Sequence, residues 1–136
     1  MFRTIGLSVI ILALLITGTA FLQIYSLPKS IEQGKEVYTT YCQNCHLIDG
    51  KGQAGAYPPL EKADYLKKPA KKIIDMILKG QSGEVTVNGI KYNAEMPAQN
   101  YLTDEQIADV LNYVYNSWGN KSVVAITPAQ VKKQRS

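Results

Sequence analysis

The sequence predicts an all-α fold with one short β-hairpin, and three observations support this prediction. A hydroxyl residue followed three positions later by glutamine is the pattern of a helix capping box, and it occurs at residues 30–33 (SIEQ) and 103–106 (TDEQ). Apolar residues recur at helical spacing within residues 68–80 and 107–118. The hairpin is indicated by Asn-Gly at residues 88–89, because this pair tolerates the positive φ angles of a tight turn.

Two helices are predicted in the first part of the domain. The first covers residues 30–41, and Pro28 is expected as a break between it and the preceding segment. The second covers residues 68–80, with Pro69 in its first turn and Gly80 as its C-terminal cap. Both helices have apolar residues on one face, so each is expected to pack against a core.

The second part contains the hairpin and two further helices. Alternating apolar residues flank the turn and predict strands within residues 85–92. Thr103 is expected to cap a helix that continues through residues 107–118. Thr127 and Pro128 suit the N-cap and first positions of a short basic helix near the C-terminus.

The charges divide the chain into three segments, which are a hydrophobic leader (1–29), a globular domain (30–120) and a basic tail (121–136). The chain as a whole has a net charge of +4. Residues 31–120 nevertheless carry 9 lysines against 11 acidic residues, a net charge of −2. The domain therefore lacks the basic surface that a phosphate backbone requires, and nucleic-acid binding is not expected.

The leader contains a run of 19 residues without charge, at positions 4–22. A helix of about 20 apolar residues spans a bilayer, and Arg3 before the run favours an N-terminus on the inner side. The alternative is a signal peptide that is cleaved after Ala20. The uncleaved anchor is favoured, because a cleaved chain would still begin with the apolar stretch FLQIY. Both interpretations place the domain on the outer side of the membrane.

Both cysteines and the only histidine of the chain stand within the five residues of CQNCH, at positions 42–46. A disulfide leaves the histidine unexplained, and a structural zinc ion needs four ligands where the motif offers three. A thioredoxin-like pair should follow a strand, whereas a helix is predicted here. Haem attachment accounts for all three residues and is favoured, with Cys42 and Cys45 as thioether ligands and His46 as an iron ligand.

The second axial position of the iron then needs a ligand, for which methionine, lysine, tyrosine, water or an open site are the alternatives. Met76 lies on the apolar face of a predicted helix, where methionine is usually core packing. Met96 lies in the turn-like segment EMPAQ and is followed by Pro97. Met96 could simply be a loop residue beneath the hairpin. The sequence favours it as the second iron ligand, because packing alone explains poorly a methionine in a polar turn.

These motifs resemble the class I c-type cytochromes, monohaem electron carriers of the bacterial type. The resemblance covers residues 30–120 and rests on CQNCH, on Met-Pro at residues 96–97 about 50 residues later, and on the helix that follows. It implies the class I cytochrome c fold, in which the N-terminal and C-terminal helices cross. It also implies one covalently attached haem c. The leader and the tail lie outside the pattern of the family.

Further positions fit the same family. Gly34 and Tyr38 match the glycine and aromatic residue of its N-terminal helix, and Tyr113 matches the aromatic residue of the helix that crosses there. The family has a proline twelve residues after the histidine, and Pro58 stands at that distance from His46. The resemblance implies that the Pro58 carbonyl accepts the Nδ1 proton of His46, which orients the ring. Other aromatic residues are expected in the haem pocket or the core, and they are Tyr57, Tyr92, Tyr101 and Trp118.

The resemblance implies an electron-transfer protein rather than an enzyme. The favoured function is a one-electron carrier with His46 and Met96 as axial ligands, tethered to or exported across the cytoplasmic membrane and acting between respiratory redox partners on the periplasmic side. The alternative is a fixed cytochrome c subunit of a membrane oxidase, reductase or dehydrogenase, and a remoter one is a haem enzyme or sensor with an open iron. The haem domain is expected to be monomeric and to meet its redox partners by brief docking at the exposed haem edge.

Overall fold

The computed structural model describes residues 25–135. The leader predicted to be a membrane anchor or signal peptide, with its apolar run at residues 4–22, lies outside the described residues. Among residues 25–135, none of the helices is both long and apolar enough to span a membrane.

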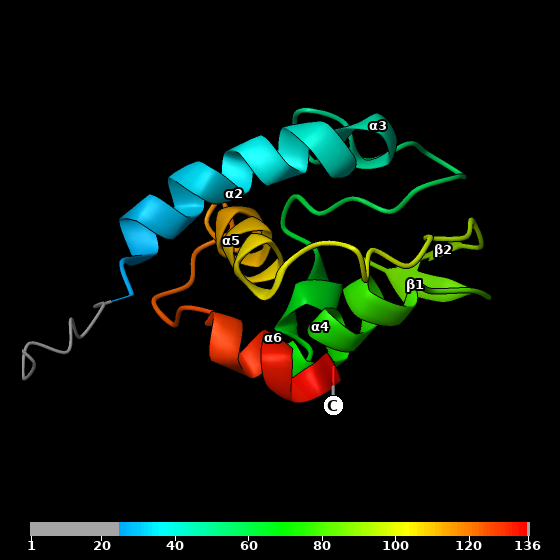
Figure 1. Cartoon of the computed structure of the whole chain (residues 1–136). Helices are drawn as coiled ribbons and strands as arrows, with labels where there is room; N and C mark the ends of the chain where they lie inside the picture. Colours follow the sequence, from blue (N-terminus) through cyan, green and yellow to red (C-terminus); the bar gives the residue numbers. More distant parts are fainter. Residues whose placement is uncertain (1–24, 136) are drawn as a thin grey trace, which may run out of the picture.

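The described chain is mostly helical, with a single hairpin (Figure 1). Its elements in order are α2 (Leu27–Tyr41), α3 (Gln43–His46), the 3₁₀ helix η1 (Asp64–Lys67), α4 (Ala70–Lys79), β1 (Val85–Val87), β2 (Ile90–Tyr92), α5 (Asp104–Val114) and α6 (Pro128–Arg135). The strands are antiparallel, and Val87 pairs with Ile90 across the turn. Asn88 and Gly89 have φ angles of 51° and 79°, so the predicted Asn-Gly turn is confirmed.

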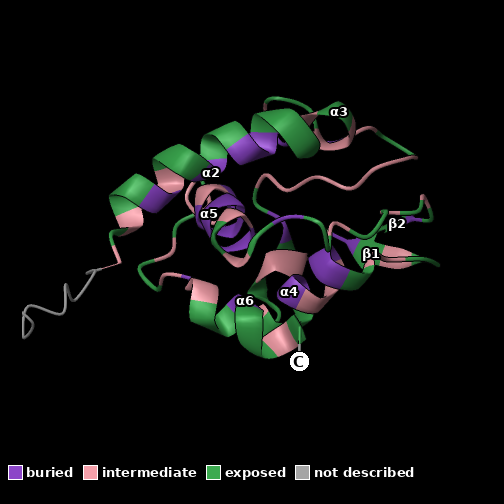
Figure 2. Ribbon diagram, in the orientation of Figure 1, coloured by how far each residue is buried: buried purple, intermediate pink, exposed green. Residues whose placement is uncertain are grey.

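Helices α2 and α5 cross at Gly34, as the resemblance to the family implies. A Cβ atom at Gly34 would lie 1.9 Å from the backbone oxygen of Asp109, so a side chain there would prevent the two helices from approaching so closely. The rings of Tyr38 and Tyr113 pack one turn further along, with centroids 5.4 Å apart. Figure 2 shows that α5 is largely buried while the outer face of α2 is exposed. The predicted all-α fold with crossing helices is confirmed.

The N-terminal end of α2 differs from the prediction. The helix begins at Leu27 with Ser26 as N-cap, and Pro28 lies in its first turn rather than before it. Proline fits there because the first helical N–H groups have no partner within the helix. Ser30 is therefore a buried residue of the helix and not its cap. Its Oγ lies 2.5 Å from Asp109 Oδ1, so it serves a tertiary contact instead.

Other helix ends are close to the predictions. Gly80 follows α4 with a φ of 77°, as expected, but Pro69 is the N-cap of α4 rather than part of its first turn. Thr103 and Gln106 form the predicted capping box of α5. The helix ends at Val114 instead of continuing to residue 118, and Trp118 itself has a φ of 51°, which an α-helix cannot accommodate.

Part of the segment that the sequence sets apart as a tail (121–136) packs against the rest of the chain, from Ile126 through α6. Thr127 and Gln130 cap α6 reciprocally, through Thr127 N to Gln130 Oε1 and Gln130 N to Thr127 Oγ1. Val131 is fully buried, and α6 contacts both α4 and α5. The loop that leads to α6 is held by Asn112, whose side chain bonds to both the backbone N–H and the carbonyl of Ile126.

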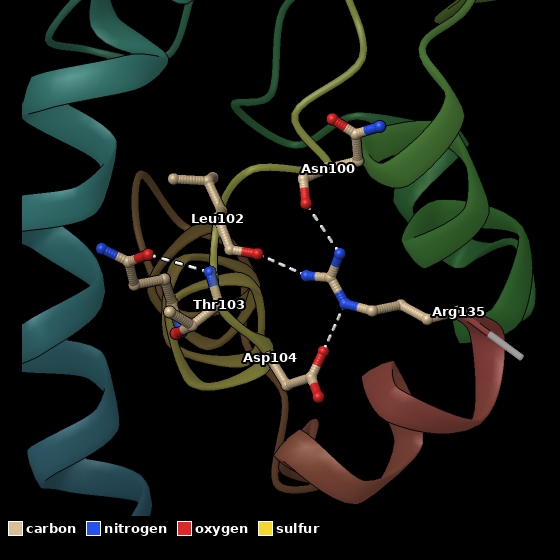
Figure 3. Close-up of polar contacts among 6 residues, drawn as sticks. Asn100, Leu102, Thr103, Asp104 and Arg135 are labelled. Atoms are coloured by element: carbon tan, nitrogen blue, oxygen red, sulfur yellow. Dashed lines mark hydrogen bonds and ion pairs between the residues drawn. The ribbon is translucent and has the colours of Figure 1, made fainter.

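The last helical residue, Arg135, ties α6 to the N-terminal end of α5 (Figure 3). Its Nε lies 2.6 Å from Asp104 Oδ1, and its two terminal nitrogens donate to the backbone oxygens of Asn100 and Leu102. One guanidinium group thus satisfies three acceptors at the start of α5, and its planar, fixed geometry makes such a contact specific.

Candidate functional site

A pocket lies between α2–α3, the loop at residues 57–60, α4 and the segment at residues 94–99, with α5 contributing to its wall. Most of its lining side chains are apolar. The predicted haem-attachment residues, iron ligands and supporting proline all line this pocket, and these residues are Cys42, Cys45, His46, Pro58 and Met96. Met76 lines it as well, from α4.

The CQNCH motif directly follows α2 and forms the single turn α3, and Cys42, Cys45 and His46 line the pocket. Cys42 is the N-cap of α3, and its carbonyl accepts hydrogen bonds from the backbone N–H groups of Cys45 and His46. Cys42 and Cys45 are both half-buried and are not joined in a disulfide. Burial, together with nearby Cys45, raises the pKa of the Cys42 thiol to about 11. With this pKa, the Cys42 side chain is protonated at pH 7 when no metal or haem is bound.

The orientation of His46 is set by one hydrogen bond. Its Nδ1 lies 3.0 Å from the backbone oxygen of Pro58, the contact that the resemblance implies. Because a carbonyl can only accept, the proton is on Nδ1, and Nε2 keeps its lone pair. Burial lowers the pKa of His46, and the hydrogen bond to Pro58 opposes this effect. The result is a neutral imidazole, the form that binds a metal.

Gly52 holds the Pro58 carbonyl near His46, a role that the sequence motifs did not identify. Its N–H donates to the His46 carbonyl at 3.0 Å, and its φ is 65°. A Cβ atom there would lie 2.4 Å from the Tyr57 oxygen and 2.5 Å from the Pro58 oxygen. The detectable signal is the pair of glycines at residues 50–52 (GKG), shortly after the motif. Glycine is needed there because the two backbone segments run so close together.

Met96 is half-buried and is held against the C-terminal end of α4. Met96 and Gln81 exchange both of their backbone hydrogen bonds, each 2.9 Å long. Gln99 N donates to the carbonyl of Ile77 at 2.8 Å and holds the other end of the loop. Gly80 permits this contact, because a Cβ atom there would lie 2.7 Å from the Met96 oxygen. Sequence spacing could not reveal these bonds, since they join segments about 15 residues apart through the backbone alone.

Three aromatic rings support the CQNCH motif from the side of the helix crossing. Trp118 packs against both Tyr38 and Tyr113, with ring centroids 5.0 and 5.4 Å away. The Tyr38 hydroxyl donates to the Leu47 carbonyl at 2.6 Å, and Trp118 Nε1 donates to the Ile48 carbonyl at 3.1 Å. The residues directly after His46 are thereby tied to the core. The hydroxyl and indole groups gain partners that a half-buried position requires.

The predicted positions of the remaining aromatic residues are partly correct. Tyr57 lines the pocket, and Tyr92 is buried beneath the hairpin with Ala63 and Val87. Tyr101 was expected in the pocket or core, but 63% of its surface is exposed. It lies just before the Thr103 cap, where the chain runs over the surface before entering α5.

The residues of the pocket fit haem c. Two thiols separated by two residues stand beside a neutral imidazole whose Nε2 is available, and apolar side chains surround them. Thioether formation needs such a pair of cysteines, and an axial ligand needs such a histidine. Met76 and Met96 both reach the same pocket, so the described chain offers two thioether side chains to it.

The comparisons agree with this chemistry. The sequence profile of the family Cytochrome c matches residues 31–118. The chain is 36% identical over 128 residues to cytochrome c-552 of Thermus thermophilus, which is 88% of this chain and 86% of that protein. It is 30% identical over 115 residues to the cytochrome c subunit of a quinone alcohol dehydrogenase from Gluconacetobacter polyoxogenes, 75% of this chain but 22% of that subunit. A gluconate 2-dehydrogenase cytochrome c subunit of Pantoea cypripedii is 30% identical over 108 residues, 76% of this chain and 24% of that subunit.

The family match covers the helix crossing, the CQNCH motif and the Met96 segment, and α6 lies beyond it. With the fold, the paired thiols and the relatives in agreement, the chain belongs to the cytochrome c family and is an electron-transfer protein with one covalently attached haem c.

Proposed function

We propose that the protein is a one-electron carrier whose haem iron is held by His46 and Met96, and that its leader tethers it to the outer face of the cytoplasmic membrane. The observation that carries the axial assignment is the bond from His46 Nδ1 to the Pro58 oxygen, 3.0 Å long, which leaves Nε2 available in a pocket that Met96 also lines. The paired backbone bonds between Met96 and Gln81 support Met96 further, because they fix the backbone that carries the sulfur.

Met76 is the competing thioether. It belongs to α4, whose neighbouring apolar residues Ile73, Ile74 and Ile77 are buried in the main core. The neighbouring core residues pack against a side chain on such a face and thereby fix its position. Met96 instead lies in a segment whose shape is set by backbone bonds and a following proline. This difference favours Met96 as the ligand and Met76 as a wall of the pocket.

The pocket residues account for the proposed activity. When bound, haem c supplies a redox centre that accepts and donates one electron. Cys42 and Cys45 would attach it covalently, and His46 and Met96 would occupy both axial positions, leaving none for a substrate. The apolar lining excludes water and disfavours the extra positive charge of the oxidised state, which raises the reduction potential. The helix crossing and the bonds around Met96 would hold these groups in place when the iron changes oxidation state.

Visible spectra of the oxidised and reduced protein test the ligands. We expect the weak red-edge band of sulfur-to-ferric-iron charge transfer in the wild type, its loss in Met96→Leu, and its retention in the matched variant Met76→Leu. Loss in Met76→Leu alone would reverse the assignment. A wild type that lacks the band and binds carbon monoxide readily would indicate an open iron, and the carrier function would then give way to a ligand-binding or catalytic one.

A fixed subunit of a membrane oxidoreductase is the second candidate. It is favoured by the similarity to dehydrogenase cytochrome c subunits and by α6, which extends the chain beyond the family match. Mild detergent extraction of membranes followed by size separation distinguishes the two. A carrier should migrate near its own mass of 15.1 kDa plus detergent, and a subunit should migrate with a larger complex.

A further inference from the structure

A loop between α5 and α6 exposes two neighbouring aliphatic side chains. Val123 is 96% exposed and Val124 is 69% exposed. Among the large hydrophobic residues of the described chain, only Ile48, at 72%, is exposed to a similar degree. Single exposed apolar side chains are common on protein surfaces, but two in succession at a loop tip are not explained by packing.

The loop has a defined shape. The Ser122 hydroxyl accepts a hydrogen bond from Val124 N–H at 3.2 Å and donates to the Val124 carbonyl at 3.0 Å. On one side of the tip, Ser122 N donates to Asn116 Oδ1. On the other side, Ile126 is held by Asn112. The two valines are therefore presented outward from a turn that is held at both ends by the asparagines at 112 and 116.

The same asparagine at 112 holds the start of the described chain. Asn112 Nδ2 lies 2.7 Å from the Tyr25 hydroxyl, and the Tyr25 hydroxyl lies 2.7 Å from Ser30 Oγ. Asn112 thus joins the N-terminal segment and the valine loop at one end of the molecule. Figure 1 shows the start of α2 and the connection from α5 to α6 at this same end, with α3 at the other end of α2.

The length of the linker brings this end close to the apolar run of the leader. The run ends at Leu22, three residues before Tyr25. Three residues span at most roughly 11 Å when fully extended. If the run crosses the bilayer, as the proposed function holds, the Tyr25 end of the domain must lie at the bilayer surface. The pocket begins at the other end of α2, where Tyr38 and Tyr41 line it, and the 15 residues of this helix extend for about 22 Å.

From this geometry we infer that the loop at residues 121–125 is a second membrane contact, whose partner is the lipid surface beside the anchor. Val123 and Val124 would enter the interfacial region, where apolar side chains leave water. Lys121 in the loop and Lys29 in the first turn of α2 are both exposed and would face anionic headgroups. The contact would hold α2 at a fixed tilt and keep the haem site away from the bilayer, accessible to redox partners.

The inference rests on the tether of the proposed function, so the test measures both separately. The full-length holoprotein is reconstituted into vesicles of phosphatidylcholine and phosphatidylglycerol, and flotation with resistance to alkaline carbonate reports the tether. A nitroxide label on Val124→Cys reports the loop. Because Cys42 and Cys45 are bound in thioethers, the introduced thiol is the one that reacts. Ile90→Cys, at an exposed aliphatic residue of the hairpin, is the matched control.

Collision of the label with oxygen, which is concentrated in lipid, is compared with collision with a water-soluble nickel chelate. We expect the oxygen-to-nickel ratio to be several-fold higher at position 124 than at position 90. Equal ratios in a protein that floats with the vesicles would overturn the loop contact and leave the tether standing. A label shielded from both reagents would indicate that a second copy of the chain covers the loop and would also overturn the lipid contact. Failure to float would overturn the tether, and the inference with it.

Discussion

Met96 and Gln81 exchange two backbone hydrogen bonds of 2.9 Å each, so the segment that carries the proposed iron ligand is fastened to the end of α4. These hydrogen bonds depend on Gly80, which has a φ of 77° and whose α-carbon lies against the backbone of Met96 and Ala98. The proposed ligand is thus positioned from a helix end that neither the CQNCH motif nor the Met-Pro pair reveals.

Gly80→Ala should therefore disturb the Met96 side of the site. The new Cβ atom would lie 2.7 Å from the Met96 oxygen, which is backbone and cannot move alone. We expect a loss of about 2–3 kcal/mol in unfolding free energy, from the clash and the strained φ angle together, and a weakened red-edge band. Gly83→Ala is the control, because Gly83 has a φ of 82° but a Cβ added there would meet no atom within 4 Å. Equal effects of the two variants would show that φ strain alone matters and that Met96 is not positioned through Gly80.

Gly34→Ala should open the crossing of α2 and α5. A methyl group there would meet the backbone of Asp109 at 1.9 Å, so the helices must separate. We expect a loss of about 3 kcal/mol or more in unfolding free energy, at the upper end of overpacking effects. Denaturant unfolding of the holoprotein measures it. The neighbouring exposed Lys35→Ala should change stability by less than about 0.5 kcal/mol. A Gly34 variant as stable as the Lys35 variant would contradict the close crossing.

Arg135→Ala should loosen α6. The side chain is 30% exposed and its partner Asp104 is 22% exposed, so the contact is partly shielded from solvent. Removing it leaves the carbonyls of Asn100 and Leu102 and the Asp104 carboxylate without this donor. We expect a loss of about 1–2 kcal/mol in thermal or denaturant unfolding, less than for a fully buried charged bond. Lys133→Ala, on the exposed surface of the same helix, is the control and should have little effect. An Arg135 variant indistinguishable from it would show that the Arg135 contacts add nothing measurable to the docking of α6.

Asp109 should make stability depend on pH in an unusual direction. Burial raises its pKa above 3.8, and hydrogen bonds from Ser30 and Tyr25 only partly oppose this. The folded chain then binds the proton more tightly than the unfolded chain, so this contribution to stability is present below about pH 4 and is lost as pH rises through the folded pKa. Asp109→Asn lacks this titration. The unfolding free energy of the variant minus that of the wild type should therefore increase as pH rises from 3 towards neutrality. A difference that is constant or that decreases would contradict the raised pKa.

Much of the fold and of the site could be predicted from local patterns. Capping boxes, helical spacing and an Asn-Gly turn act over a few residues, so the sequence alone indicates α4, α5, α6 and the hairpin. The prediction failed at Ser30, whose pattern is a capping box although its hydroxyl bonds across to Asp109. It failed again at Tyr101, which is exposed rather than in the pocket. In both cases a contact, or the lack of one, with a distant part of the chain decided the outcome.

The sequence by itself determined the chemistry of this protein. The two cysteines and the histidine of CQNCH provide the groups for haem attachment within five consecutive residues, so this chemistry does not depend on contacts between distant parts of the chain. Only the tertiary structure decided how those groups are held. Gly52 lets the backbone of Tyr57 and Pro58 approach closely, Met96 is hydrogen-bonded to Gln81, and Asn112 joins the start of α2 to the valine loop. These contacts join segments that are distant in sequence, and backbone approach and hydrogen-bond direction, which set them, have no pattern along the chain.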